Sequence, residues 1–90
     1  MDLNIQSINF DADQKLLDFA DQRAKKLEQF YDHIISADIY LKFESKSGQI
    51  KDKTAEIKLN IPGNTLFGSG TNKTFEDALD EAFESVRRQI

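Results

Sequence analysis

The sequence predicts an α+β fold with the element order βαβββα, in which two helices cover one face of a four-stranded mixed sheet. Two kinds of apolar periodicity predict it. Apolar and polar residues alternate over 36–44 and again over 55–61, which is typical of strands with one buried face. Over 13–31 and 74–90 the apolar residues instead recur at helical spacing. A chain of 90 residues has room for one sheet and one covering layer, so we expect a single domain spanning residues 1–90.

The N-terminal half is expected to form a strand followed by the first helix. The strand covers about residues 3–10, where the apolar phase slips before Ile8 and Phe10 and indicates a bulge. Asp11 or Asp13 can cap the helix, because a short side-chain acceptor satisfies the free N–H groups of the first turn. The apolar face of this helix comprises Leu16, Leu17, Ala20, Ala24, Leu27 and Tyr31.

The remaining strands are separated by polar and turn-forming segments. A polar stretch, residues 45–53, joins the two alternating strands into a hairpin. Residues 62–64 (Pro-Gly-Asn) form the next turn, and a short strand interrupted by glycines follows at about 65–70. We expect this strand to lie at an edge of the sheet, and we interpret Gly68 and Gly70 as edge-strand glycines.

Charge is distributed unevenly along a chain whose formal net charge is -4. The closing helix begins with a sequence that resembles a capping box at Thr74, and residues 74–86 contain five acids and no base. Arg87 and Arg88 follow directly. An acidic balance argues mildly against a nucleic-acid partner, because phosphate binding normally shows as a basic excess. We expect the acidic stripe of this helix to face solvent or a basic protein.

Residue types that support catalysis or metal binding are scarce. The chain has no cysteine and a single histidine, His33, so neither a metal-ligand pair nor a nucleophile–base motif is present. The glycines do not follow a phosphate-cradling pattern. We expect no enzyme activity, cofactor, metal or small-molecule substrate. The N-terminus lacks the features of a signal peptide and no apolar run is long enough to span a membrane, which favours a soluble cytoplasmic protein.

Basic residues on one flank of the first helix and at the end of the second are the candidate phosphate-binding groups. They are Lys15, Arg23, Lys26, Arg87 and Arg88. Taken alone, such charges are usually a solvated face. Phe19 and Phe30 share the flank of the first helix, where they could fill the groove between the helices or contact nucleotide bases. Tyr40 on the open sheet face leaves a similar choice between cross-strand packing and stacking on RNA.

Several short segments together carry a resemblance to a known family. Residues 26–32 (Lys-Leu-Glu-Gln-Phe-Tyr-Asp), followed by the alternating strand, are the most informative of them. The opening residues 3–5, the turn at 62–64 and the segments 78–80 and 88–90 extend the likeness over essentially the whole chain. In this order they resemble the short form of the ribosome hibernation-promoting factors and ribosome-associated inhibitors, formerly labelled sigma-54 modulation proteins.

The resemblance implies a non-catalytic protein whose fold resembles a double-stranded RNA-binding domain. The implied partners are the small ribosomal subunit and its rRNA, with basic ribosomal proteins as a further option for the acidic stripe. The protein would occupy the channel used by mRNA and tRNA and silence ribosomes in stationary phase or under stress. Matched by position, Arg23, Lys26 and Arg88 correspond to the family's rRNA contacts, whereas Lys15 and Arg87 are added from their expected geometry. The alternative is a non-enzymatic protein-interaction module that uses the open sheet face or the edge strand, including as a homodimer.

Overall fold

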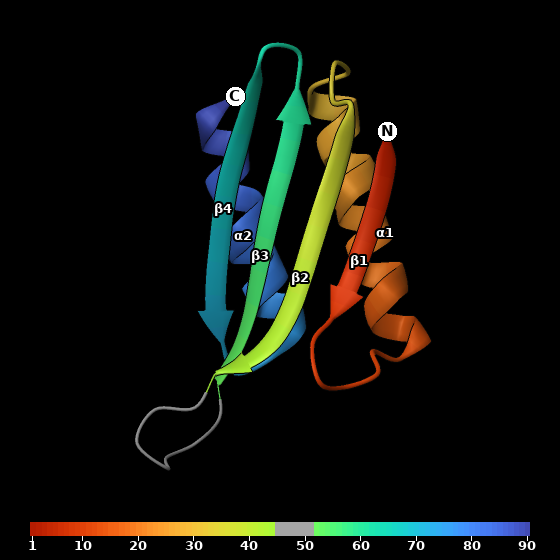
Figure 1. The fold of residues 1–90 in the computed structure, drawn as a ribbon, viewed down its shortest axis with the longest axis vertical. Coiled ribbons are helices and arrows are strands. Elements are labelled where there is room, and N and C mark those ends of the chain that lie inside the picture. The colour runs from red at the N-terminus through yellow and green to blue at the C-terminus, as the bar shows by residue number, and fades with distance from the viewer. Residues whose placement is uncertain (45–51) are drawn as a thin grey trace.

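The computed structural model of the protein describes residues 1–44 and 52–90. The predicted order of elements is confirmed, and the chain in Figure 1 can be followed from the N-terminal strand to the C-terminal helix. The elements are β1 (Asp2–Ser7), α1 (Gln14–Phe30), β2 (Ser36–Glu44), β3 (Asp52–Ile61), β4 (Asn64–Asn72) and α2 (Phe75–Gln89). The polar connection predicted at 45–53 lies for the most part outside the described residues.

The four strands form one mixed sheet in the order β1-β2-β3-β4. β1 runs parallel to β2, whereas β2, β3 and β4 are antiparallel neighbours, as predicted for the hairpin. One row across the inner face places Ile5 beside Ile39, Ile39 beside Ile57, and Ile57 beside Gly68. The register therefore brings the apolar residues of three strands onto the same face, because side chains alternate between the two faces.

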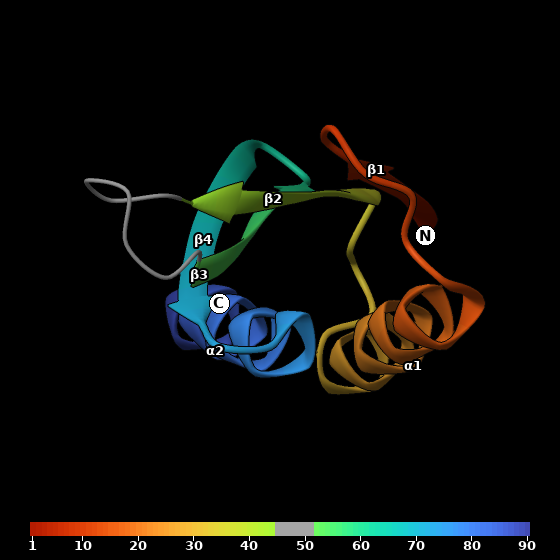
Figure 2. The same ribbon diagram turned by 90° about the horizontal axis from the view of Figure 1, so that it is seen from below.

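Both helices cover that inner face and run in the same direction (Figures 1 and 2). Figure 2 shows α2 beneath β3 and β4, with α1 beside it toward β1. The buried face of α1 consists of Leu16, Ala20, Ala24 and Leu27, as predicted, while Leu17 and Tyr31 are only partly buried. The largest fully buried side chains of the core are Ile39, Leu41, Ile57, Leu59, Leu79 and Val86.

The glycines of β4 have a packing role that the sequence did not reveal. Gly68 and Gly70 face α2, where the helix backbone leaves no room for a side chain. A Cβ atom added at Gly70 would lie far inside contact distance of the Ala78 carbonyl oxygen. One added at Gly68 would lie 2.7 Å from the Ala82 carbonyl oxygen. These glycines let helix and strand backbones approach closely. For this reason they do not interrupt the strand, and β4 extends to Asn72, beyond the predicted end at residue 70. Its predicted position at an edge of the sheet is confirmed.

The predicted bulge in the first strand is wrong. The pairing with β2 ends at Ser7, and the N–H of Ile8 donates a final hydrogen bond to the carbonyl oxygen of Leu41. Asn9 then adopts a left-handed conformation, with φ of 63°, which turns the chain away from the sheet. The apolar residues that follow the phase slip therefore belong to the loop rather than to a continued strand.

An aromatic cluster closes the core where this loop meets the sheet. Phe10 stacks on Phe75 with ring centroids 4.9 Å apart and meets Phe43 edge-on at 5.0 Å. Such pairs contribute roughly 0.5–1.5 kcal/mol each beyond the burial of their area. Phe43 stays 42% exposed, although its place in the alternating strand predicts burial. It lies near the end of β2, where the covering layer stops.

Side-chain caps fix the start of each helix. The Asp13 carboxylate accepts a hydrogen bond from the Leu16 N–H at 2.9 Å, so Asp13 rather than Asp11 is the N-cap of α1. The Thr74 hydroxyl accepts from the Asp77 N–H at 3.1 Å, which confirms the predicted cap of α2. Because the helices are parallel, both N-termini lie at the same end of the molecule (Figure 1).

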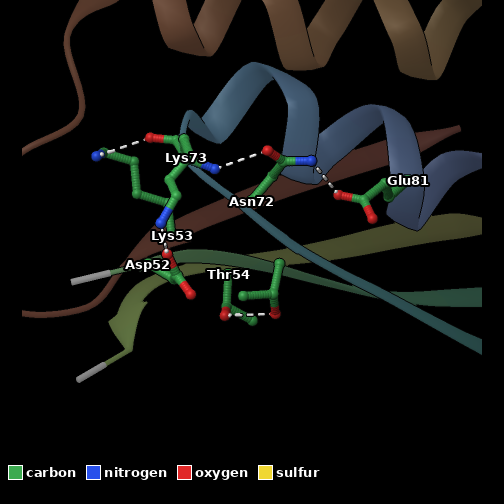
Figure 3. A network of polar contacts seen from close by, with 7 residues as sticks. Asp52, Lys53, Thr54, Asn72, Lys73 and Glu81 are labelled. Carbon is green, nitrogen blue, oxygen red and sulfur yellow. Dashed lines mark hydrogen bonds and ion pairs between the residues drawn. The ribbon is translucent and has the colours of Figure 1, made fainter. Parts of the chain in front are cut away.

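A polar network ties the start of β3 to the end of β4 and to α2 (Figure 3). The Lys53 ammonium donates to the Lys73 carbonyl oxygen at 3.0 Å, and the Lys73 ammonium lies 3.0 Å from the Asp52 carboxylate. The Asn72 amide donates to the Glu81 carboxylate at 2.9 Å. These contacts connect three elements next to the tight turn that leads from β4 into α2.

The free edge of β4 is partly covered by the last turn of α2. The Gln89 side-chain amide donates to the Phe67 carbonyl oxygen at 2.7 Å and to the Ser85 carbonyl oxygen at 3.2 Å. In the described part of the chain no strand pairs with this edge. The helix thus satisfies a strand acceptor that would otherwise face solvent.

Candidate nucleic-acid interface

A groove runs between the two parallel helices on the side of the molecule away from the sheet. Its volume is about 490 Å³. Because α1 and α2 run side by side, residues spaced by three or four positions on each helix form its two walls. The lining residues are Arg23, Lys26, Leu27, Phe30, Asp80, Phe83, Glu84 and Arg87. Three cations and two carboxylates therefore share one groove.

Arg23 crosses from one helix to the other. Its Nε atom lies 2.6 Å from the Asp80 Oδ1 atom, and its guanidinium carbon lies 4.3 Å from the centre of the Phe19 ring. The hydrogen bond to Asp80 raises the pKa of Arg23 above its ordinary value. Both partners are more than a third exposed, so the pair adds only about 0–1 kcal/mol to stability. The pair orients the guanidinium without burying it.

Arg87 is held within its own helix. Its Nε and Nη2 atoms donate to the two Glu84 carboxylate oxygens at 2.8 and 2.5 Å, a two-point pairing one turn apart. This hydrogen bonding lowers the pKa of Glu84 and raises that of Arg87. The guanidinium carbon of Arg87 also lies 5.8 Å from the centre of the Phe30 ring, which connects it to the wall formed by α1.

The other three predicted residues form no ion pair with a carboxylate in the described part of the chain. Among the described residues, no acid lies within ion-pairing distance of Lys15, Lys26 or Arg88. Lys26 lines the groove, and Lys15 stands on the same flank of α1 near its start. Arg88 instead borders a separate hollow beside β4, which is also lined by three acids of α2, Asp80, Glu81 and Glu84. The structure thus brings Arg23, Lys26 and Arg87 together in the groove, whereas Lys15 and Arg88 lie outside its lining.

The acidic stripe contributes two carboxylates to the groove itself. It was expected to face solvent or a basic protein, and Asp80 and Glu84 stay 47% and 49% exposed while they line the groove and pair with Arg23 and Arg87. The spacing of residues 80, 84 and 87 places them on one helix face and could have revealed the local pair. The pair with Arg23 joins residues far apart in the sequence, so the sequence carried no local signal for it.

Phe30 is the second feature of the groove that the sequence left open. It does not fill the space between the helices, because 62% of its surface remains exposed at the end of α1. Phe19 on the same flank is partly buried beneath Arg23. An exposed aromatic ring therefore stands among the cations of the groove.

The outer face of the sheet offers a second exposed aromatic residue. Phe67 is 65% exposed on β4 and borders a shallow hollow of about 410 Å³ together with Tyr40 and Lys58. Tyr40 lies between Gln6 and Glu56 on the neighbouring strands, which agrees with cross-strand packing. The cations of this face among the described residues are Lys42, which pairs with Glu56, and Lys58, which lies opposite Asp38 on the neighbouring strand.

Other kinds of site have little support in residues 1–44 and 52–90. No group of three or more potential ligands there could hold a metal ion. His33 is solvent-exposed beside Asp32, as expected for a solvated histidine. No helix among these residues is long and apolar enough to cross a membrane.

A mixed sheet with two parallel helices on one face, and a charged groove between the helices, defines a small α+β fold. Its family can be stated as well. The chain belongs to the family described as Sigma 54 modulation protein / S30EA ribosomal protein, whose model matches residues 3–90.

Relatives of known name share the whole length of the chain. It is 32% identical to the ribosome hibernation promoting factor of Klebsiella oxytoca, with 100% of this chain and 90% of that protein covered. The corresponding factor of Escherichia coli K12 is 27% identical with the same coverage. A ribosome hibernation promotion factor of Bacillus subtilis is also 27% identical, and this chain spans 47% of its length.

Solved structures confirm the fold. A ribosomal subunit interface protein from Coxiella burnetii superposes with a TM-score of 0.87 at 13% identity, covering 99% of this chain and 92% of the other. The N-terminal domain of Protein Y from Thermus thermophilus gives a TM-score of 0.83 at 19% identity, covering 99% and 94%. The expected likeness to a double-stranded RNA-binding domain stays a prediction.

Proposed function

We propose that this chain is a ribosome hibernation factor, a single cytoplasmic domain that binds the rRNA of the small ribosomal subunit and silences translation. The family match over residues 3–90 includes both helices, and relatives covering the whole chain are named for this activity. The observation that carries the proposal within the structure is the convergence of Arg23, Lys26 and Arg87 on one groove. Cations on two helices can contact several phosphates of a folded RNA at once, and such contacts fix the position and orientation of the protein.

The proposed mechanism is occupancy. The domain fills the channel used by mRNA and tRNA, and charge-assisted hydrogen bonds to phosphates hold it there. No bond is made or broken, and no cofactor takes part. Lys15 and Lys26 supply charges that no ion pair occupies among the described residues, and Arg88 adds a charge beside the acids of α2. Arg23 and Arg87 exchange a carboxylate for a phosphate. Breaking these two ion pairs costs the protein little stability, because exposed ion pairs contribute little to the free energy of unfolding.

Sedimentation of purified ribosomes tests this proposal. The protein should pellet with the small subunit, reduce translation in a reconstituted reaction, and be displaced by mRNA together with tRNA. Its logarithmic affinity should fall with the logarithm of salt concentration by roughly 0.7–0.9 for each phosphate contact. Undiminished translation at low salt, with a molar excess of the protein, would refute the proposal.

A matched pair of variants assigns the surface. Replacing Lys15 and Lys26 by Gln removes two charges from α1 without breaking an ion pair known among the described residues. Replacing Lys42 and Lys58 by Gln removes the same charge from the outer face of the sheet. We expect the first double variant to lower the salt slope by roughly 1.4–1.8 and the second to leave it unchanged. The reverse result would place the interface on the sheet.

The second candidate function is a protein-interaction module that uses the outer sheet face. Phe67 favours it, because an aromatic ring that is 65% exposed beside Tyr40 offers apolar contact area. This function predicts association that is insensitive to salt and is lost in Phe67→Ala. Ultracentrifugation of the protein alone, at low and high salt, separates the two candidates.

A further inference from the structure

The groove contains an apolar surface that phosphate binding does not use. Phe30 ends α1 with 62% of its surface exposed, between Lys26 on its own helix and Arg87 on the other. The Arg87 guanidinium carbon lies 5.8 Å from the ring centre, so the cation covers the ring incompletely. An exposed ring beside cations is the arrangement on which unpaired nucleotide bases stack.

The carboxylates of the groove decide which part of RNA fits inside it. Asp80 and Glu84 both line the groove, so a phosphate placed deep between the helices would meet two carboxylates, and we expect phosphates to reach Arg23 and Arg87 only from the rim. A base is neutral, presents an apolar face for Phe30, and in most cases carries amino groups that donate hydrogen bonds to carboxylates. The groove volume of about 490 Å³ falls within the range of small-ligand sites.

We infer that the interhelical groove holds one unpaired RNA base stacked on Phe30, while the phosphate of the same nucleotide contacts Lys26 at the rim. This inference rests on the proposed function and names the part of the RNA that enters the groove. Phe30 contributes stacking, Lys26 contributes charge, and the carboxylates favour a base over a phosphate in the interior. Binding at this site therefore requires RNA with an unpaired base and is not satisfied by a polyanion.

A fluorescence experiment tests the contact directly. The chain contains no tryptophan, so Phe30→Trp introduces a single reporter into the groove and Phe67→Trp introduces one on the opposite face at nearly equal exposure. A single-stranded RNA oligonucleotide should quench the emission of the first variant and leave the second unchanged. Inorganic polyphosphate at the same charge should quench neither. Equal quenching by RNA and polyphosphate, or quenching at both positions, would overturn the inference.

Ribosome affinity supplies the second readout. Phe30→Ala and Phe30→Leu should each weaken binding by about 5- to 150-fold, the range for losing one stacked base, with the salt slope unchanged. Phe30→Tyr should retain wild-type affinity because it keeps the aromatic ring. Lys26→Gln should instead lower the slope by roughly 0.7–0.9. Phe67→Ala is the matched control and should bind as the wild type does.

The outcomes separate this inference from the proposed function. If Phe30→Ala binds normally while Lys26→Gln binds weakly, the stacking contact is wrong and ribosome binding stands. If the wild-type protein does not bind ribosomes at all, both fail. Circular dichroism of Phe30→Ala should match the wild type, because the ring is exposed. Retained helix content with lost affinity would support the contact.

Discussion

Phe30 and Phe67 are nearly the same by exposure and differ in their surroundings. They are 62% and 65% exposed, one at the end of α1 and the other in the middle of β4. Phe30 stands in a groove with three cations and two carboxylates, whereas Phe67 lies on a shallow sheet face beside Tyr40 and Lys58. The difference shows that exposure of an aromatic ring does not identify a binding site. The charged groups around a ring decide which kind of partner it suits.

The largest expected effect comes from reversing charge on one of these two regions. The double variant Arg23→Glu with Lys26→Glu should weaken ribosome binding by roughly 100-fold or more, because two charged contacts become repulsive. Sedimentation with the small subunit measures the loss. The matched variant on the outer face, Lys42→Glu with Lys58→Glu, should bind as the wild type does.

These two double variants also share their main structural cost. Arg23→Glu puts a new acid beside Asp80 and Lys42→Glu puts one beside Glu56, where the present ion-pair distances are 2.6 and 3.5 Å. Lys58→Glu adds a further acid opposite Asp38. Thermal unfolding should therefore shift at least as much in the sheet variant as in the groove variant, so that a loss of binding confined to the groove variant cannot come from lost stability. Ribosome binding that survives the change at Arg23 and Lys26 would remove the groove from the interface.

The next effect concerns the packing of α2 against β4, because α2 forms one wall of the groove. Gly70→Ala should lower the free energy of unfolding by about 1–3 kcal/mol, because the new Cβ would collide with the Ala78 carbonyl oxygen and with Glu81. Ser69→Ala, one position away on the outer face, should stay within about 0.5 kcal/mol. Urea denaturation measures both, and equal stability of the two variants would contradict the close approach of helix and strand.

A smaller effect is expected from releasing a paired cation. Asp80→Asn frees Arg23 and removes a negative charge from the groove, so ribosome affinity should stay unchanged or rise, by up to about fivefold. Glu56→Gln, which frees Lys42 on the sheet, should change nothing. Titration of labelled ribosomes with each variant checks this. Asn keeps an oxygen that can accept a hydrogen bond from a base, so a large loss in Asp80→Asn would mean that binding needs the negative charge of Asp80.

The smallest effect is a change in titration. Hydrogen bonding from Arg87 lowers the pKa of Glu84 from its ordinary value in the folded state. The ionised carboxylate therefore favours folding above its unfolded pKa, and this contribution is lost as the pH falls through the lower, folded pKa. Arg87→Gln should raise the pKa of Glu84 and weaken that dependence. Carboxyl NMR titration measures the shift, and an unchanged pKa would show that the pairing does not persist in solution.

Most of the fold could be predicted because periodicity and caps are local properties. The alternation around Ile39 and Ile57 fixed which side of the sheet is buried, and Thr74 marked the start of α2. The glycines of β4 could not be interpreted fully, because their function depends on a helix that arrives later in the chain. The error at Ile8 has a related cause, since only pairing with β2 decides where β1 ends.

The candidate site was predictable in composition and not in geometry. Lys26 and Arg87 stand out as cations on helix flanks, and their convergence follows once the helices are known to be parallel. The pairing of Arg23 with Asp80 depends on how the helices meet, which no local pattern contains. The exposure of Phe30 is likewise a result of packing, because the same helix position would be buried if the groove closed.

The amide of Gln89 has a consequence for crowded solutions. A nine-residue edge strand is a template on which another molecule can add a strand, and such growth can continue into fibres. By holding the Phe67 carbonyl oxygen, Gln89 makes an incoming chain displace the end of a helix before it can pair there. The last turn of α2 thus works as a gatekeeper against aggregation.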